Sequence, residues 1–274
     1  MRDGLPKIRQ ETQTGVAPEW KFVTMSGEGK KQDLSHAVCA VVRQYADKKT
    51  IELVGTGFFV AKGGIFITAR HVLNTALDDD PRGPFGLGII QFIPNSGFVE
   101  RPVRRCIVSN AADIGFGIAA EMTSPTRGKL ENPVLRLSTR DPKVGEPVFT
   151  YAYPDTVMVH REKLTELHLN PHFYEGKIEE HFPDKRDASI LTWPCFQTSM
   201  HLNGGSSGGP AFDSTGAVFG INTASMAPYT DVSYVTKVKE ALNLAIDDVR
   251  IGVDATPSVY SLRELAKLGF AIID

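Results

Sequence analysis

Short apolar runs, rich in β-branched and aromatic residues, recur along most of the chain and are separated by turn residues. The clearest runs are residues 37–42, 51–60, 64–69, 88–93, 103–108, 144–154, 217–223 and 231–235. Runs of this length at hairpin spacing are typical of antiparallel barrels and sandwiches. The pattern therefore predicts an all-β protein.

Helical periodicity appears only towards the end of the chain. Apolar side chains between Val235 and Ile246 recur at intervals of one and three residues, which predicts an amphipathic helix over 235–246. Ser261-Leu-Arg-Glu264 has the arrangement of a capping box, and Gly269 is a stop signal, so a second short helix is expected between them. Residues 270–273 predict a short closing strand.

The apolar runs also divide the chain. Residues 1–35 are polar with scattered apolar side chains and are interpreted as an N-terminal extension. We expect the main domain to cover 36–246, with one half over about 36–135 and the other over about 136–236. Residues 247–274 remain as a C-terminal extension. The N-terminal extension is a candidate regulatory segment, or it simply packs along the domain.

Composition and charge exclude several classes of function. The 274 residues are 42% hydrophobic and 23% charged, with a net charge of -2, so no basic field for nucleic acid is expected. No apolar run reaches the length of a membrane span, so no membrane partner is expected. Three cysteines, Cys39, Cys106 and Cys195, and an amino terminus without an apolar leader favour a cytoplasmic location.

Two groups of residues have the composition of metal sites but not the pattern. Asp78-Asp79-Asp80 lacks the alternating oxygen ligands of a calcium loop, which favours a solvated surface loop over residues 74–88. His168 and His172 have the spacing of two zinc ligands on a helix, but Pro171 would break that helix. We therefore expect surface histidines, and neither a metal nor a cofactor.

The run Gly204-Gly-Ser-Ser-Gly-Gly-Pro210 carries the candidate chemistry. A hydroxyl among glycines can be presented while neighbouring backbone N–H groups approach a ligand closely, although a flexible linker would have the same composition. Ser207 supplies the hydroxyl, and the N–H groups of Gly205 and Ser207 are suited to an oxyanion hole. His71, at the end of a strand, is a candidate base, and Asp113, in an apolar run, is a candidate orienting carboxylate.

Together these segments resemble a known family. Thr68-Ala-Arg-His71-Val, Ala112-Asp113-Ile-Gly and Gly205-Ser-Ser207-Gly-Gly-Pro resemble the three signature segments of the chymotrypsin/trypsin superfamily, in its order His, Asp, Ser. The resemblance implies an all-β fold of two antiparallel six-stranded β-barrels, with a C-terminal helix and short terminal extensions. It also implies a His71, Asp113 and Ser207 triad that cleaves protein or peptide substrates.

Within the superfamily, the motifs are most similar to HtrA-like bacterial peptidases. The segments 201–210 and 220–223 carry this likeness. Digestive relatives have an aspartate immediately before the nucleophile, where this chain has Ser206, so activation by a newly cleaved amino terminus is not expected. HtrA proteins also append a PDZ domain, for which residues 247–274 are too few. We expect regulation to come from the extensions, a regulatory protein partner or assembly.

The same alignment suggests a specificity pocket. It puts His201 near the floor and Thr223, Ala224 and Ser225 on one wall. These side chains favour small or medium apolar residues of the substrate, while His201 and Asn222 leave an acidic preference open. The sequence thus predicts a serine endopeptidase in regulated intracellular proteolysis. The alternative is a latent or inactive protease-fold protein that acts through binding partners.

Overall fold

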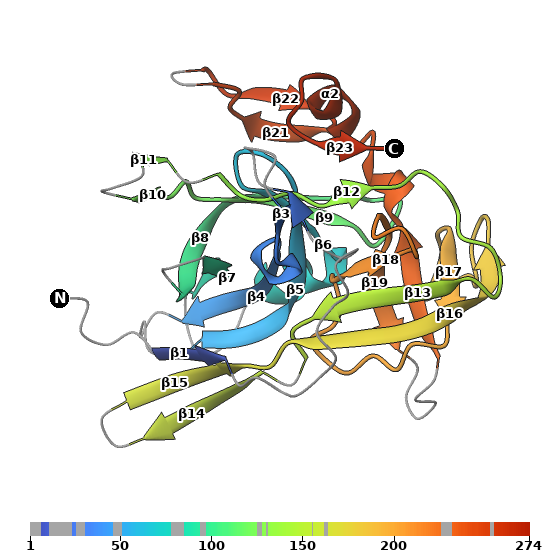
Figure 1. Cartoon of the computed structure of the whole chain (residues 1–274), viewed down its shortest axis with the longest axis horizontal. Coiled ribbons are helices and arrows are strands. Elements are labelled where there is room, and N and C mark those ends of the chain that lie inside the picture. Colours follow the sequence, from blue (N-terminus) through green and yellow to red (C-terminus); the bar gives the residue numbers. More distant parts are fainter. Residues whose placement is uncertain are drawn as a thin grey trace.

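The computed structural model (Figure 1) describes most of the chain, and strands dominate it. The described residues are 7–10, 24–25, 31–45, 51–77, 85–93, 97–124, 128–129, 131–154, 156–161, 164–225, 232–252 and 255–274. Its two α-helices are short, α1 at Arg70–Leu77 and α2 at Leu262–Lys267.

The first barrel is a closed ring of six antiparallel strands in the order β4-β5-β6-β9-β8-β7. Their bounds are β4 Val38–Tyr45, β5 Ile51–Ala61, β6 Ile65–Thr68, β7 Phe85–Ile93, β8 Gly97–Val108 and β9 Gly115–Ala119. Side chains of its strands such as Phe58, Phe66 and Phe116 are fully buried. The apolar runs predicted as strands in this half all lie in it.

The second barrel also has six strands, in the order β18-β13-β16-β17-β20-β19, and a further pairing of β18 with β19 closes the ring. Their bounds are β13 Pro147–Ala152, β16 His172–Phe182, β17 Cys195–Thr198, β18 Pro210–Phe212, β19 Val218–Ser225 and β20 Ser233–Lys237. The predicted fold of two six-stranded antiparallel barrels is confirmed. One apolar cluster contains buried side chains from both barrels, so the two halves share a core.

A hairpin between the barrel strands was not predicted. β14 (Val157–Arg161) and β15 (Leu164–Leu169) form an antiparallel pair that extends away from the barrels at the lower left of Figure 1, and β1 (Lys7–Gln10) adds to β15 in parallel. The following strand, β16, is half-buried or exposed except at Ile178. Leu167 and Leu169 of β15 are buried in the core, but single buried residues between polar ones leave no continuous apolar run in the sequence.

Short elements complete the described chain. β2 (Thr24–Met25) pairs with β3 (Lys31–Gln32), and β10 (Thr123–Ser124) pairs with β11 (Gly128–Lys129). The 3₁₀ turn η2 (Leu34–His36) leads into β4, and Leu34 is buried in the core.

The predicted helix over 235–246 is wrong. β20 continues to Lys237, a 3₁₀ turn (η3, Val238–Ala241) follows, and β21 begins at Ile246. The N–H of Leu242 donates to the carbonyl of Lys239, so the spacing of three that imitated an α-helix comes from a tight turn. Val238, Ala241 and Ile246 are all fully buried, which explains the apolar periodicity without a helix.

The expected surface loop over 74–88 is shorter than predicted. α1 continues to Leu77 and β7 begins at Phe85, while Asp78, Asp79 and Asp80 lie outside the described residues. His168 is the second-to-last residue of β15 and His172 is the first of β16, so these two histidines lie on two strands and not on one helix.

The C-terminal segment packs against both barrels, at the top of Figure 1. It contains β21 (Ile246–Val249), β22 (Ser258–Tyr260), α2 and β23 (Ile272–Ile273), so the predicted short helix and closing strand are confirmed. Ser261 and Glu264 form the expected capping box. β23 pairs in parallel with β12 (Arg136–Leu137), which itself pairs with β19.

The described residues were also predicted to hold neither a membrane span nor a metal site. No helix there is both long and apolar enough to cross a membrane. No three His, Cys, Asp or Glu side chains in the described ranges gather to hold a metal ion. All three cysteines are free thiols.

Candidate active site

His71 and Asp113 lie together next to two paired strands of the first barrel. His71 is the second residue of α1, directly after β6, and Asp113 precedes β9, the strand that pairs with β6. The Asp113 side chain is buried, and its Oδ2 lies 2.8 Å from Nδ1 of His71. Its Oδ1 accepts the backbone N–H of His71 at 2.9 Å. Both carboxylate oxygens of Asp113 therefore hold His71. When Nδ1 of His71 donates to Asp113, its Nε2 is unprotonated and can accept a proton.

A local turn presents Asp113. The hydroxyl oxygen of Ser109 accepts the N–H groups of Ala111 and Ala112, at 3.1 and 3.2 Å, and the N–H of Ser109 donates to the carbonyl of Ile114. Arg70 donates to the carbonyl of Ser109 at 3.0 Å. The bend that carries the carboxylate is thus tied to the helix that carries His71.

The serine loop consists of two overlapping turns. Ser206 N–H donates to the carbonyl of Asn203 at 3.1 Å, and Gly209 N–H donates to the carbonyl of Ser206 at 3.1 Å. The third residue of each turn is a glycine with positive φ, Gly205 at 92° and Gly208 at 86°, as type II turns require. Ser207 is the second residue of the latter turn, so the glycine-rich run is an ordered site and not a linker.

Thr56 on β5 joins this loop to the first barrel. Its N–H donates to the carbonyl of Ser207 at 2.8 Å, and its hydroxyl donates to the carbonyl of Gly205 at 2.8 Å. The same hydroxyl accepts the N–H of Tyr153 at 3.0 Å. A Cβ on Gly208 would lie 2.1 Å from Oγ1 of Thr68, the residue three before His71. The serine loop of the second barrel therefore rests on the strands that lead to His71.

The hydroxyl of Ser207 donates to the carbonyl of Thr223 at 3.4 Å. Among the described hydrogen bonds none joins Ser207 to His71. Catalytic hydrogen bonds are often long or poorly aligned before a substrate binds, so this orientation describes the unliganded site.

The backbone N–H groups of the loop fall into two sets. Those of Ser206, Gly208 and Gly209 donate to carbonyls within the protein. Within the described part of the chain, no acceptor is found for the N–H of Gly205 or of Ser207. The two amides predicted to receive an oxyanion are thus among the amides of the loop that have no acceptor in the described structure.

The suggested specificity residues differ in exposure. His201 is exposed, Ala224 is half-buried, and Thr223 is buried with its hydroxyl bonded to Oγ1 of Thr236 at 2.5 Å. The side chain of Ser225 lies outside the described residues. The hydroxyl of Thr223 is thus directed to a neighbouring strand.

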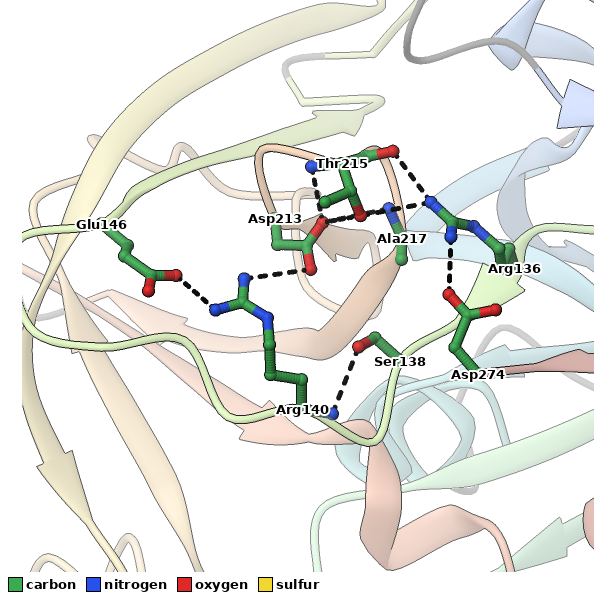
Figure 2. Close-up of polar contacts among 8 residues, drawn as sticks. All are labelled: Arg136, Ser138, Arg140, Glu146, Asp213, Thr215, Ala217 and Asp274. Carbon is green, nitrogen blue, oxygen red and sulfur yellow. Dashed lines mark hydrogen bonds and ion pairs between the residues drawn. The ribbon is translucent and has the colours of Figure 1, made fainter.

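The hairpin that follows the serine loop is anchored by a buried carboxylate (Figure 2). Asp213, between β18 and β19, accepts the N–H and the hydroxyl of Thr215 at 2.8 and 2.6 Å. Arg140 donates to the other oxygen of Asp213 at 3.3 Å. Arg136 donates to the carbonyl of Thr215 at 2.9 Å and to the Asp274 carboxylate at 2.6 Å. These contacts connect the hairpin to the C-terminal strand.

The cysteine thiols are poor nucleophiles. Burial raises the pKa of Cys39 to about 12, and that of Cys106 and of Cys195 to about 11. All three are therefore protonated at neutral pH.

Sequence inspection missed two residues of the site, Thr56 and Asn222. Thr56 stands between two glycines in an apolar strand. A polar residue flanked by glycines could have indicated that another part of the chain packs closely there. Asn222 was considered only for the specificity pocket, and its contacts with the serine loop depend on pairing across the barrel.

Comparisons with known proteins agree with this geometry. A family model for the trypsin-like peptidase domain matches residues 55–221, which is more than half of the chain. No curated protein sequence matches the chain.

Solved structures with a similar fold include Deg5, an HtrA-type protease and a protease domain. Deg5 is 19% identical with a TM-score of 0.55, over 75% of this chain and 85% of that one. The HtrA-type protease AlgW with a tripeptide is 19% identical with a TM-score of 0.54, over 76% of this chain and 58% of that one. The MamO protease domain from Magnetospirillum magneticum is 15% identical with a TM-score of 0.52, over 75% and 94%.

At such low identities the likeness to these structures shows the fold alone. The family match spans most of both barrels, without β4 and β20, and it includes His71, Asp113 and Ser207. This chain belongs to the trypsin-like peptidase family.

Proposed function

We propose that the protein is a serine endopeptidase that acts through His71, Asp113 and Ser207. The observation that carries the proposal is the pairing of both Asp113 oxygens with His71, next to a serine loop seated on β5. A buried carboxylate that orients a histidine is the arrangement needed to make a serine nucleophilic.

The proposed reaction follows from the geometry. Ser207 Oγ attacks the peptide carbonyl while Nε2 of His71 takes its proton. Asp113 keeps the imidazole in place and stabilises its positive charge. The N–H groups of Gly205 and Ser207 receive the oxyanion, and His71 then protonates the leaving amine. Water, activated by His71, releases the acyl group from Ser207.

One local movement precedes this reaction. The Ser207 hydroxyl must leave the carbonyl of Thr223 and turn towards His71. Rotation about one side-chain bond is fast on the timescale of turnover and needs no backbone change. The 3.4 Å length of the bond to Thr223 indicates that little energy opposes the rotation.

The finer assignments belong to the same proposal. The substrate is a protein or peptide, and small or medium apolar residues are preferred next to the cleaved bond, with an acidic residue as the alternative. Regulated proteolysis in the cytoplasm and control by a protein partner are part of the hypothesis, which rests on the sequence features described above.

A latent protease or a binding protein is the second candidate. The observation that favours it is the Ser207 hydroxyl, which is bonded to Thr223 and not to His71. In a latent enzyme, reactivity of Ser207 would be weak in the isolated protein and would rise when a partner binds.

Peptide-library cleavage and fluorophosphonate labelling, with wild type and Ser207→Ala in parallel, test the proposal. We expect labelling of wild type alone and a loss of turnover of about four to six orders of magnitude in the variant, as when a catalytic triad acts as a unit. Equal cleavage by both proteins would show that Ser207 is not the nucleophile. A wild-type protein that is never labelled would favour the binding protein.

A further inference from the structure

Asn222 on β19 contacts the serine loop through three of its groups. Its N–H donates to the carbonyl of Gly209 at 2.9 Å, and its carbonyl accepts the N–H of Gly208 at 2.8 Å. Its side-chain Nδ2 donates to the carbonyl of Ser206 at 3.3 Å. The residue is buried, and it spans the turn that contains Ser207.

The side-chain contact bears on the oxyanion hole through the geometry of one peptide bond. The carbonyl of Ser206 and the N–H of Ser207 belong to the same planar unit, and in a trans peptide they point in opposite directions. The Ser206 carbonyl accepts from both Asn222 Nδ2 and Gly209 N–H. Holding that carbonyl therefore directs the Ser207 N–H away from Asn222, as a free donor.

We propose that Asn222 is a positioning residue that orients the oxyanion-hole amide of Ser207. The inference rests on the proposed function and extends it to a residue outside the triad. Asn222 touches neither the substrate nor the reacting atoms, because it acts through the Ser206–Ser207 peptide.

Thr150 on β13 holds the Asn222 amide in place. Nδ2 donates its second hydrogen bond to Oγ1 of Thr150 at 2.8 Å, so both N–H groups of the amide are used. A carboxylate at this position could accept from the Thr150 hydroxyl but could not donate to the Ser206 carbonyl, and an apolar side chain would donate to neither. The hydrogen bonds to Thr150 and Ser206 therefore favour an amide side chain at position 222.

The side-chain oxygen of Asn222 argues against a purely structural role for this residue. Oδ1 of Asn222 is buried and has no hydrogen-bond partner among the described residues. An unsatisfied buried acceptor costs about 1–3 kcal/mol, which an apolar residue would avoid. The presence of an amide here is therefore explained by what Nδ2 does for the loop.

Kinetics of Asn222→Ala and Asn222→Asp test the proposal, with a cleaved library peptide as substrate. We expect kcat to fall about 10- to 100-fold with KM changed less than about threefold, because the oxyanion forms only in the transition state. Binding of a peptide trifluoromethyl ketone, which forms an oxyanion on Ser207, should weaken in parallel. Thr150→Val keeps the amide but removes its anchor, so a smaller loss in the same direction is expected even if an Asn222 variant folds poorly.

Gln91→Ala is the matched control. Gln91 is a buried amide on β7 that bonds to Arg101 and to the carbonyl of His36, and none of these hydrogen bonds reaches the serine loop. Its replacement should lower the melting temperature and leave kcat unchanged. If the Asn222 variants lose stability but keep wild-type kcat and ketone affinity, the positioning role is wrong. A wild-type protein that neither cleaves nor is labelled would instead overturn the proposed function, and this role with it.

Discussion

The glycines of the serine loop illustrate how single residues determine the site. Gly208 has a positive φ and also faces Oγ1 of Thr68 and the carbonyl of Thr56, both closer than 3 Å to any added Cβ. Gly204, by contrast, has open space at that position. Gly208 is therefore required both by its backbone conformation and by close contacts, whereas no contact requires a glycine at position 204.

Gly208→Ala should strongly reduce activity. The new methyl group would lie 2.1 Å from Oγ1 of Thr68, so the loop must move away from the strand that leads to His71. We expect a loss of at least about 100-fold in kcat/KM, as when a catalytic group is displaced by about 1 Å. Gly204→Ala is the control and should retain most activity. Comparable kinetics for the two variants would show that the approach to Thr68 is not needed.

His181 is a second residue with a testable role, in the pH dependence of stability. Burial, and then the positive charge of Lys237, lower its pKa, and its ring stacks on Phe196. Nε2 contacts Nζ of Lys237 and lies 3.7 Å from Asp141, which also binds Lys239. The neutral ring is the form that accepts a hydrogen bond from a lysine.

Acidification should therefore destabilise the protein through His181. Because the folded pKa is lowered, the unfolded chain takes up the proton first as the pH falls through about 6.5, the ordinary value for histidine. The contribution of His181 to the free energy of unfolding is fully present above that pH and is lost as the pH falls below it. His181→Gln keeps an acceptor for Lys237 without titrating, so its melting temperature should fall less than that of wild type between pH 7 and pH 5. Equal slopes would contradict this assignment.

At the scale of elements, the C-terminal segment holds the two barrels from outside. Lys62 N–H of the first barrel donates to the carbonyl of Phe270 at 2.9 Å, and Asp274 N–H donates to the carbonyl of Leu137 at 2.9 Å. Leu262 and Leu265 of α2 are fully buried in the core. A segment that was interpreted as an extension is thus part of the packed structure.

Leu265→Ala should destabilise the whole protein and not only α2. Removing a fully buried leucine side chain costs about 2–5 kcal/mol, through lost burial and the cavity left behind. Thermal unfolding should show a single transition at a lower temperature. Leu268→Ala, at a position 52% exposed, is the control and should change the free energy of unfolding by less than about 0.5 kcal/mol. An unchanged Leu265→Ala protein would mean that α2 is not part of the cooperative unit.

At the scale of the molecule, the site lies where the barrels meet, and Thr56 joins them. His71 and Asp113 come from the first barrel and Ser207 from the second. The hydroxyl of Thr56 is bonded to Gly205 and Tyr153, both of the second half of the chain. The relative position of base and nucleophile therefore depends on contacts between barrels.

Thr56→Val should reduce both stability and activity. It leaves the Gly205 carbonyl and the Tyr153 N–H without their partner, at a cost of about 1–3 kcal/mol for each buried group. We expect kcat to fall because the serine loop loses an attachment to the first barrel. Thr56→Ser keeps the hydroxyl and should behave like wild type in both kinetics and thermal unfolding. A valine variant with wild-type kcat would show that the remaining loop contacts suffice.

Most strands of the first barrel, and β13, β19 and β20 of the second, were predictable because their buried side chains leave short apolar runs in the sequence. The outer hairpin β14–β15 was not, and the helix predicted over 235–246 is a strand end followed by tight turns. Periodicity reports which residues are buried but not which backbone buries them. A 3₁₀ turn and an α-helix both bring residues three apart to one side.

The sequence by itself determined the fold class and the residue types of the candidate site. Glycines at positions of positive φ, and a histidine, an aspartate and a serine in order, are local features that the order of residues contains. The tertiary structure alone decided the roles of Thr56 and Asn222, because their partners lie on other strands and are brought close by barrel closure. It also decided the direction of the Ser207 hydroxyl and of the loop amides, since hydrogen-bond direction depends on the folded backbone and not on residue type.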